Sequence, residues 1–260
     1  MDVKLVQHDN GRAVLRVQGV SPAYMNTLRR TMMTEVPVLA VEDVEFRKNS
    51  SALYDEMIAH RLGMLSIKTD PQTYNLPKEC KCEGAGCAQC QVKMTLEASG
   101  PKTVYADDLQ SQDPKAKPVH GKTPIVKLLE GQEVELEATA TMGQGKDHSK
   151  WNAGLVHYKE YPHLTVKKQP ANAKALADKY PELVQVKGGK ITIREEGLVN
   201  NDVHEALIAE ADGAITLDYK DDYLLYIEPW EQLTAKEIVE GAFERLDQSL
   251  EEVKALIKEA

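Results

Sequence analysis

Residues 20–37 read VSPAYMNTLRRTMMTEVP, a segment with a start signal and a stop signal for one helix. Ser21 is a residue type that caps helix N-termini, and Pro22 suits the first turn because its missing amide proton needs no partner there. Pro37 cannot continue a helix, so the helix must end before it. Its apolar residues fall at helical spacing and predict one buried stripe, formed by Tyr24, Met25, Leu28 and Met32.

Strands are predicted on both sides of this helix. Residues 1–18 predict two short strands around Asn10-Gly11, a dipeptide that adopts the positive backbone angles of a tight hairpin turn. The branched residues of 38–46 predict a further strand. The two strands of 1–18 and the helix that follows them are too few to bury a core alone, so this part of the chain needs another segment to pack on.

The pattern changes after residue 46. Segment 47–165 has short alternating strands and many loops, as in 92–98, and predicts a mostly β domain with one solvated face. Residues 171–213 predict a small unit of two helices and a strand. A hairpin is expected between strands at 215–219 and 223–227.

The C-terminal helix begins with a capping box, in which Thr234 and Glu237 have the spacing for reciprocal hydrogen bonds to backbone amides. Apolar residues then recur in steps of four and three, which is a heptad seam. The seam consists of Val239, Phe243, Leu246, Leu250, Val253 and Ile257. At roughly 1.5 Å per residue, helix 234–260 would reach about 40 Å, which is long for a small domain. The seam packs either across the chain's own sheet or against a partner chain.

The composition limits the classes of function. The chain has 260 residues, a formal net charge of −9 and 5% aromatic residues. The length favours two domains, while the acidic balance and few aromatics argue against a surface that grips phosphates or stacks bases. No stretch approaches the roughly 18 to 20 apolar residues that span a bilayer, and the N-terminus lacks the apolar core of a secretory signal. We therefore expect a cytoplasmic protein without membrane attachment.

All four cysteines lie within eleven residues, in CKCEGAGCAQC at 80–90. Four thiolates suit tetrahedral zinc, and a closed set of four ligands leaves no open position for catalysis. We therefore expect one structural zinc ion, bound by Cys80, Cys82, Cys87 and Cys90. An iron-sulfur cluster also uses four cysteines, but more often at other spacings. Two disulfides are a further alternative, which a reducing compartment disfavours.

The sequence contains no strong catalytic motif. GQGKDH at 143–148 matches neither the dinucleotide fingerprint nor the Walker pattern, and no serine occupies a Gly-x-Ser-x-Gly elbow. The histidines lack metal-site spacing, so we interpret His60, His148 and His157 as structural. Arg29 and Arg30 are either two solvated cations or a docking contact to an acidic surface or a carbonyl-rich loop of a larger partner. No residue is assigned a catalytic role.

Several segments together resemble one family. VSPAYMNTLRRT at 20–31 with Glu35-Val36-Pro37 after it, ALYDEMIAHRLG at 52–63 and GKDHSKW at 145–151 are similar to the RNA polymerase alpha subunit and its archaeal and eukaryotic counterparts. The archaeal counterpart, of the D type, is the most similar, because the chain ends soon after the heptad helix. The cysteine loop resembles the zinc loop of the third-largest eukaryotic polymerase subunit, with slightly different spacing.

The resemblance implies an α+β fold with a split architecture. Residues 1–46 and 166–260 would form a discontinuous dimerisation domain, the β-rich domain 47–165 would be inserted between them, and 171–213 would be a small ferredoxin-like insertion. Many archaeal members of the family hold iron-sulfur clusters in that insertion. This chain has no cysteine there, so no cluster is expected.

The resemblance also implies a non-catalytic assembly subunit of DNA-directed RNA polymerase. Such a subunit pairs with a small alpha-like subunit of the L type and docks the second-largest catalytic subunit and small zinc-bearing subunits of the N and P types. Nucleic acid would be met only through the whole complex. The interface would comprise Tyr24, Leu28, Arg29, Arg30 and Met32 with the heptad seam. Two other functions stay open: a free-standing zinc-binding, nucleic-acid-associated protein, and a zinc enzyme, which needs an open coordination position.

Overall fold

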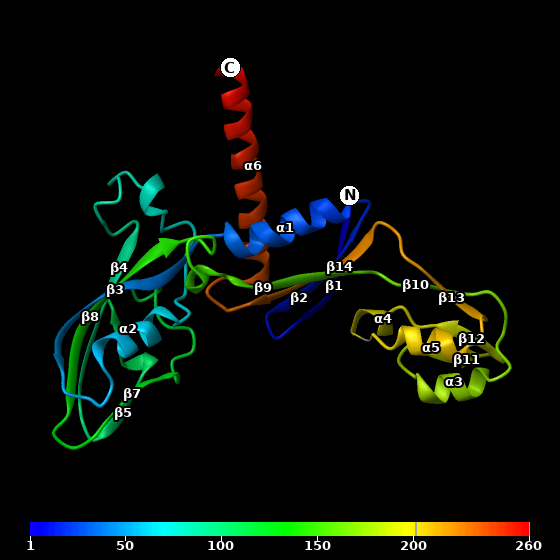
Figure 1. Cartoon of the computed structure of the whole chain (residues 1–260), viewed down its shortest axis with the longest axis horizontal. Coiled ribbons are helices and arrows are strands. Elements are labelled where there is room, and N and C mark those ends of the chain that lie inside the picture. Colours follow the sequence, from blue (N-terminus) through cyan, green and yellow to red (C-terminus); the bar gives the residue numbers. More distant parts are fainter. Residues whose placement is uncertain (201, 260) are drawn as a thin grey trace. The chain divides into compact units, whose positions relative to one another are not determined.

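The computed structural model describes residues 1–200 and 202–259, without the side chain of Glu259. Its backbone contacts divide the chain into two compact units. The larger unit contains Asp9–Arg12, Thr27–Val156 and Ile227–Ala260, and the smaller contains Met1–His8, Ala13–Asn26 and His157–Tyr226. Figure 1 shows the elements of both units along the sequence.

The larger unit is built on an antiparallel four-stranded sheet in the order β3-β8-β4-β6. These strands are β3 (Val38–Asn49), β4 (Gln91–Ser99), β6 (Gln110–Ser111) and β8 (Glu133–Gly143). The alternation predicted for 92–98 is confirmed, because Met94 and Leu96 are buried whereas Thr95 and Glu97 are exposed. One face of β4 therefore contributes to the core and the other faces solvent.

Helix α2 (Asp55–Gly63) packs on this core through Ile58 and Leu62, which are fully buried. A second antiparallel pair, β5 (Lys102–Tyr105) and β7 (Pro124–Leu128), contributes to the same core. Figure 1 shows α2 beside these strands. The described part of the unit also contains three short 3-10 turns, η1 (Pro77–Glu79), η2 (Ala106–Asp108) and η3 (Ser149–Trp151).

Strand β3 extends beyond the strand predicted at 38–46. It pairs with β8 from Val38, opposite Gly143, to Asn49, opposite Val134. Its last residues are polar, and Arg47 forms an ion pair with Glu135 across the strands at 3.2 Å. Strand β3 lies at the edge of the sheet, where polar side chains are tolerated, and cross-strand ion pairs stabilise its last residues. The strand therefore continues past the apolar residues from which it was predicted. The expected domain boundary at 46 and 47 therefore falls inside β3.

The predicted N-terminal hairpin is confirmed as β1 (Asp2–Asp9) and β2 (Arg12–Gln18). Asn10 and Gly11 have φ angles of 46° and 79°, the left-handed region that this turn requires. These strands join β14 (Asp222–Pro229) and β9 (Gly154–Glu160) in a sheet of order β1-β2-β14-β9.

The hairpin predicted between 215–219 and 223–227 is wrong. Both strands exist, but β13 (Ile215–Asp218) pairs with β10 (His163–Val166), whereas β14 lies between β2 and β9. Strands β9 and β10 follow one another along the chain, and so do β13 and β14. Because β14 pairs with β9 and β13 pairs with β10, the stretches 154–166 and 215–229 run side by side as a two-stranded ribbon. The ribbon bends between the two strand pairs. Alternation detects strands but not their partners, which explains the error.

The small mixed unit predicted at 171–213 contains α3 (Ala173–Lys179), β12 (Lys190–Ile193) and α5 (His204–Glu210), as predicted. It also contains β11 (Val184–Lys187), which pairs with β12, and the single turn α4 (Gly197–Asn200). Each of these two additions has four residues. Their apolar residues share a core that includes Leu176, Leu183, Ile191, Leu198 and Leu207.

The two helices predicted from end signals are confirmed as α1 (Pro22–Thr34) and α6 (Ala235–Glu259). At the start of α6, the Thr234 amide donates to Glu237 Oε2 at 2.7 Å, and the Glu237 amide donates to Thr234 Oγ1 at 3.3 Å. Ala260, the last residue of the expected helix, lies outside the described residues. Among the described helices, none is both long and apolar enough to cross a membrane.

Candidate metal centre and interface helices

The four cysteine sulfurs converge on one point before β4, all within 4.8 Å of one another. Cys80 Sγ lies 3.5 Å from Cys87 Sγ, and Cys82 Sγ lies 3.6 Å from Cys90 Sγ. Zinc held by four thiolates at about 2.3 Å places its sulfurs about 3.8 Å apart. The spacing therefore fits one tetrahedral ion, and it is far longer than the roughly 2.05 Å of a disulfide. All four are free thiols.

Short turns bring the two cysteine pairs together. The Glu83 amide donates to the Cys80 carbonyl at 2.9 Å, and the Cys90 amide donates to the Cys87 carbonyl at 3.0 Å. Gly84 and Gly86 between these turns have φ angles of 83° and 86°. These positive angles, which glycine adopts without steric cost, reverse the chain between the two pairs.

The thiols of this cluster differ in acidity. A hydrogen bond with Cys80, with further ones from Cys90 and Cys87, lowers the pKa of Cys82 to about 6. Burial raises the pKa of Cys90 to about 12. A metal held by four thiolates must therefore displace at least the Cys90 proton at neutral pH, so metal binding and proton release are linked. The donor set suits a soft tetrahedral ion and is consistent with zinc.

The structure separates the predicted interface residues of α1 by exposure. Leu28 and Met32 are 3% and 1% exposed, so this chain itself covers them. Tyr24 and Arg29 are half-buried, and Arg30 is exposed. The helical stripe was therefore a signal of burial, and it did not reveal which chain provides the covering surface. A partner can reach only the three less buried residues.

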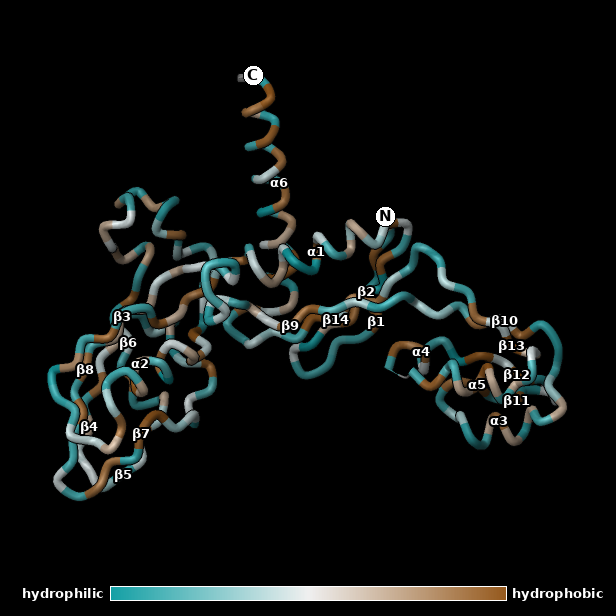
Figure 2. The backbone as a smooth tube through the Cα atoms, in the orientation of Figure 1, coloured by the Kyte–Doolittle hydropathy of each residue, from teal (hydrophilic) through white to brown (hydrophobic). Residues whose placement is uncertain are grey.

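The heptad seam changes its surroundings along α6. The fully buried Ile238 and Ala242 anchor the first turns, and Val239, Phe243 and Leu246 are half-buried. The last seam residues are exposed: Leu250 by 57%, Val253 by 52% and Ile257 by 70%. Figure 2 shows hydrophobic segments recurring toward the end of α6. The end of α6 therefore leaves an apolar stripe in solvent.

Residues 144–146 pack against the C-terminal end of α1. Lys146 Nζ donates to Glu35 Oε2 at 2.7 Å, and Gln144 Nε2 donates to the Glu35 carbonyl at 2.7 Å. Gly145 approaches the helix so closely that a Cβ there would lie 2.2 Å from the Met33 carbonyl oxygen. Gly145 is therefore needed for packing against α1, and this contact explains the glycine in GQGKDH at 143–148 without a phosphate-binding role.

Two of the three histidines named above make structural contacts. His148 Nδ1 accepts a hydrogen bond from the Lys150 amide at 3.1 Å and so caps η3. His157 stacks on Tyr226 with ring centroids 4.7 Å apart, and His60 is exposed in the last turn of α2. The contacts of His148 and His157 favour the structural interpretation of these two residues over a catalytic one.

Sequence reasoning missed a polar contact between the cysteine loop and α6. Arg245 on α6 donates to the carboxylate of Glu79, which immediately precedes Cys80. The heptad pattern concerns apolar positions only. Nothing in the spacing of these two charges, 166 residues apart, could have predicted their contact.

Comparison with known proteins gives a consistent set of relatives. A family model described as the RNA polymerase Rpb3/RpoA insert domain matches residues 44–158, which overlap the segment 47–165 expected to be inserted. The DNA-directed RNA polymerase subunit Rpo3 of Methanosphaera stadtmanae is 37% identical over 243 residues, 88% of each chain. Proteins of the same name from Methanosarcina acetivorans and Pyrococcus horikoshii are also similar. The Methanosarcina acetivorans protein is 36% identical over 99% of this chain and 98% of its own length. The Pyrococcus horikoshii protein is 41% identical over 64% of this chain and 62% of its own length.

Proposed function

Because the chain belongs to the Rpo3 family of DNA-directed RNA polymerase subunits, we propose that it is a non-catalytic assembly platform of that enzyme, of the archaeal D type. The observation that carries this proposal is the exposed seam of α6, formed by Leu250, Val253 and Ile257. Water contacts these side chains in the isolated chain. A partner that covers them is favoured by the hydrophobic effect.

The partner best suited to this seam is another amphipathic helix. Residues at heptad spacing form a straight apolar row, which a second helix can match with a row of its own. Covering a side chain that is about half exposed contributes on the order of 1 kcal/mol, so several such positions are needed for stable pairing. A small alpha-like subunit of the L type fits this requirement, with the split domain 1–46 and 166–260 as the dimerisation domain.

A second surface is proposed for the second-largest catalytic subunit. Arg30 is exposed, and its guanidinium has no acidic partner within the described part of the chain. Arg29 is half-buried, and its Nη1 lies 3.6 Å from Met33 Sδ. A planar guanidinium suits carboxylates and backbone carbonyls of a docking surface, so Arg30 is the better placed of the pair. Subunits of the N and P types would complete the assembly.

One structural zinc ion is proposed at Cys80, Cys82, Cys87 and Cys90. When bound, the ion would cross-link a loop that has little apolar core, and its closed shell would leave no position for substrate. Cys80 and Cys90 are buried, whereas Cys82 and Cys87 are half-buried. No iron-sulfur cluster is proposed, either here or in 171–213.

The experiment that tests the platform role is affinity purification from an archaeal host that expresses a tagged copy of the chain. Polymerase subunits in equal amounts, with an L-type subunit among them, are the expected result. Recovery of the chain on nucleic acid without other polymerase subunits would instead favour the free-standing nucleic-acid-associated alternative. The net charge of −9 speaks against that alternative.

A further inference from the structure

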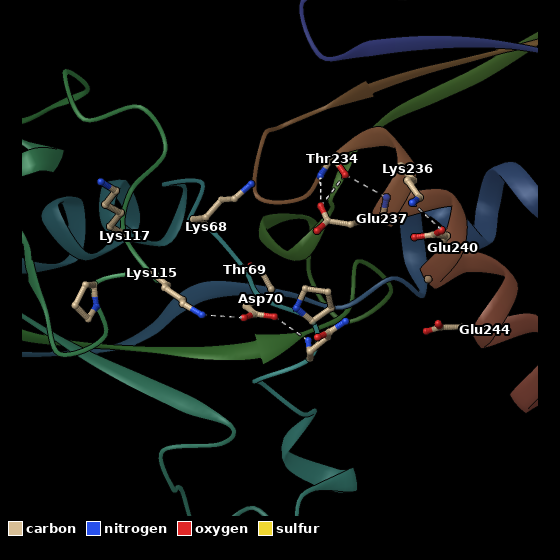
Figure 3. Close-up of a pocket in the computed structure, with 14 residues that line it drawn as sticks. Lys68, Thr69, Asp70, Lys115, Lys117, Thr234, Lys236, Glu237, Glu240 and Glu244 are labelled. Carbon is tan, nitrogen blue, oxygen red and sulfur yellow. Dashed lines mark hydrogen bonds and ion pairs between the residues drawn. The ribbon is translucent and has the colours of Figure 1, made fainter. Parts of the chain in front are cut away.

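A cleft in the larger unit has walls of opposite net charge. It lies between the start of α6 and two loops, and its volume is about 800 Å³. The wall formed by the loops contains Lys68, Lys115 and Lys117 together with Asp70, and the wall formed by α6 contains Glu237, Glu240 and Glu244 together with Lys236. Figure 3 shows Lys68, Lys115 and Lys117 on one side of the cleft, and α6 with its glutamates and Lys236 on the other.

The walls of the cleft are held by backbone hydrogen bonds. The Lys68 amide donates to the Lys117 carbonyl at 2.8 Å, which joins the two lysine-bearing loops. The Thr69 amide donates to the Gln232 carbonyl at 3.0 Å, close to the start of α6. Thr69 is only 3% exposed, and its Oγ1 accepts from the Leu39 amide at 3.0 Å. The cleft is therefore preformed, which reduces the entropy that a ligand must overcome.

Only part of this charge is neutralised inside the chain. Glu240 lies 3.6 Å from Lys236 on its own helix, and Lys115 lies 3.8 Å from Asp70. Lys68, Lys117 and Glu244 have no charged partner among the described residues, and all three are exposed. Two cations on one wall thus face an unpaired carboxylate on the other.

Charge of both signs in one cleft restricts its occupant. A nucleic-acid backbone would meet the helix carboxylates, and a polycation would meet the lysines, so each is repelled by one wall. A polypeptide carries both signs at short spacing. Pro71, Pro114 and Gly241 also line the cleft, and they provide apolar surface for the stem of such a segment.

We propose that this cleft binds an extended segment of another polymerase subunit, with an acidic side chain toward Lys68 and Lys117 and a basic side chain toward Glu244. The inference rests on the proposed function. It adds a third contact surface, distinct from the seam at the end of α6 and from the arginines of α1. Exposed charges at an interface determine specificity and orientation more than affinity. The charges of the cleft therefore set the direction in which the segment binds.

The test uses assembled polymerase purified through this chain, with photoreactive benzoylphenylalanine in place of Gln72. Gln72 is exposed and lines the cleft. We expect cross-links to one polypeptide subunit, through a peptide that contains both an acidic and a basic residue. The double variant Lys68→Glu/Lys117→Glu should lower the yield of this cross-link about tenfold. The matched control Lys122→Glu/Lys127→Glu reverses two exposed lysines outside the cleft and should leave it unchanged.

Glu244→Lys tests the other wall and should also lower the yield, whereas Glu97→Lys on the solvent face of β4 should not. Cross-links to nucleic acid, an absence of cross-links, or equal yields in cleft and control variants would each overturn the inference. Recovery of the L-type subunit is measured in the same samples. If the cross-link is absent while that subunit is retained, only the cleft proposal fails; if polymerase does not assemble on the wild-type chain, the proposed function fails.

Discussion

Arg245 donates to both carboxylate oxygens of Glu79, from Nη1 to Oε1 at 2.7 Å and from Nη2 to Oε2 at 3.2 Å. This ion pair fastens the turn before Cys80 to α6, the helix that carries the exposed seam. The Glu79 side chain is 52% exposed, so solvent screens the pair and its contribution to stability is about 1 kcal/mol or less. The cysteine loop and the seam are therefore connected, but only weakly coupled.

Metal analysis tests the centre. We expect close to one zinc per chain and no iron or acid-labile sulfide. Cys87→Ser should reduce zinc occupancy, because it removes one of four ligands of a closed shell. Binding of the partner through α6 should persist in Cys87→Ser. Even if the disturbed loop loses the contact between Glu79 and Arg245, the affinity for the partner should fall by about fivefold at most. Glu79→Gln is the control that keeps zinc while weakening the ion pair. Stoichiometric iron, or complete loss of pairing in Cys87→Ser, would contradict this account.

Substitutions in the seam test the pairing surface. Leu246→Asp and Leu250→Asp should both abolish recovery of the small partner, since an unpaired carboxylate in an apolar contact costs at least about 3 kcal/mol, roughly 100-fold in affinity. Leu250 is the sharper test because it is 57% exposed, so its replacement leaves the fold of the chain unchanged. Ser249→Asp, at an exposed neighbouring position, is the control. A pull-down in which Leu250→Asp retains the small partner refutes the seam as the pairing surface.

The arginines of α1 should behave differently from the seam. Arg30→Ala and Arg29→Ala should weaken binding of the second-largest subunit while the small partner stays bound, with a loss of about tenfold for the exposed Arg30. Lys122→Ala, another exposed cation, is the control. Competition pull-downs with both partners measure the two affinities. Release of the small partner with retention of the large one would reverse the assignment of surfaces.

Local signals in the sequence predicted the elements that depend on neighbouring residues. Ser21 and Pro37 bracket α1, Thr234 and Glu237 cap α6, and the cysteine site lies within one loop. Pairing between distant strands had no such signal, which is why β13 was assigned the wrong partner. The same limit applies to packing, because helical spacing shows that a side chain is buried without identifying the surface that covers it.

A buried carboxylate provides a test of pH dependence. Asp222 is 3% exposed at its side chain and accepts hydrogen bonds from Arg16 Nη2 at 2.6 Å and Gln18 Nε2 at 2.9 Å. His163 Nε2 lies 3.0 Å from Asp222 Oδ2, but it is not aligned for a hydrogen bond. The site lies where the ribbon bends between β13 and β14, and the Tyr161 amide donates to the Asp222 carbonyl there at 2.8 Å.

Burial alone would raise the pKa of Asp222, but the hydrogen bonds from Arg16 and Gln18 outweigh it, so the pKa lies below its ordinary value. A lowered folded-state pKa stabilises the fold above the unfolded value, about 3.9, and this stability is lost as the pH falls through the folded pKa. Asp222→Asn should therefore lower the stability of the bend by about 3 kcal/mol at pH 7, because Arg16 then lacks its counter-ion. The deficit relative to wild type should shrink below about pH 4. Hydrogen exchange of the Tyr161 amide at pH 7 and pH 3 measures both effects, with the exposed Asp221→Asn as the control. A deficit that grows on acidification would show that the Asp222 carboxylate does not stabilise the bend.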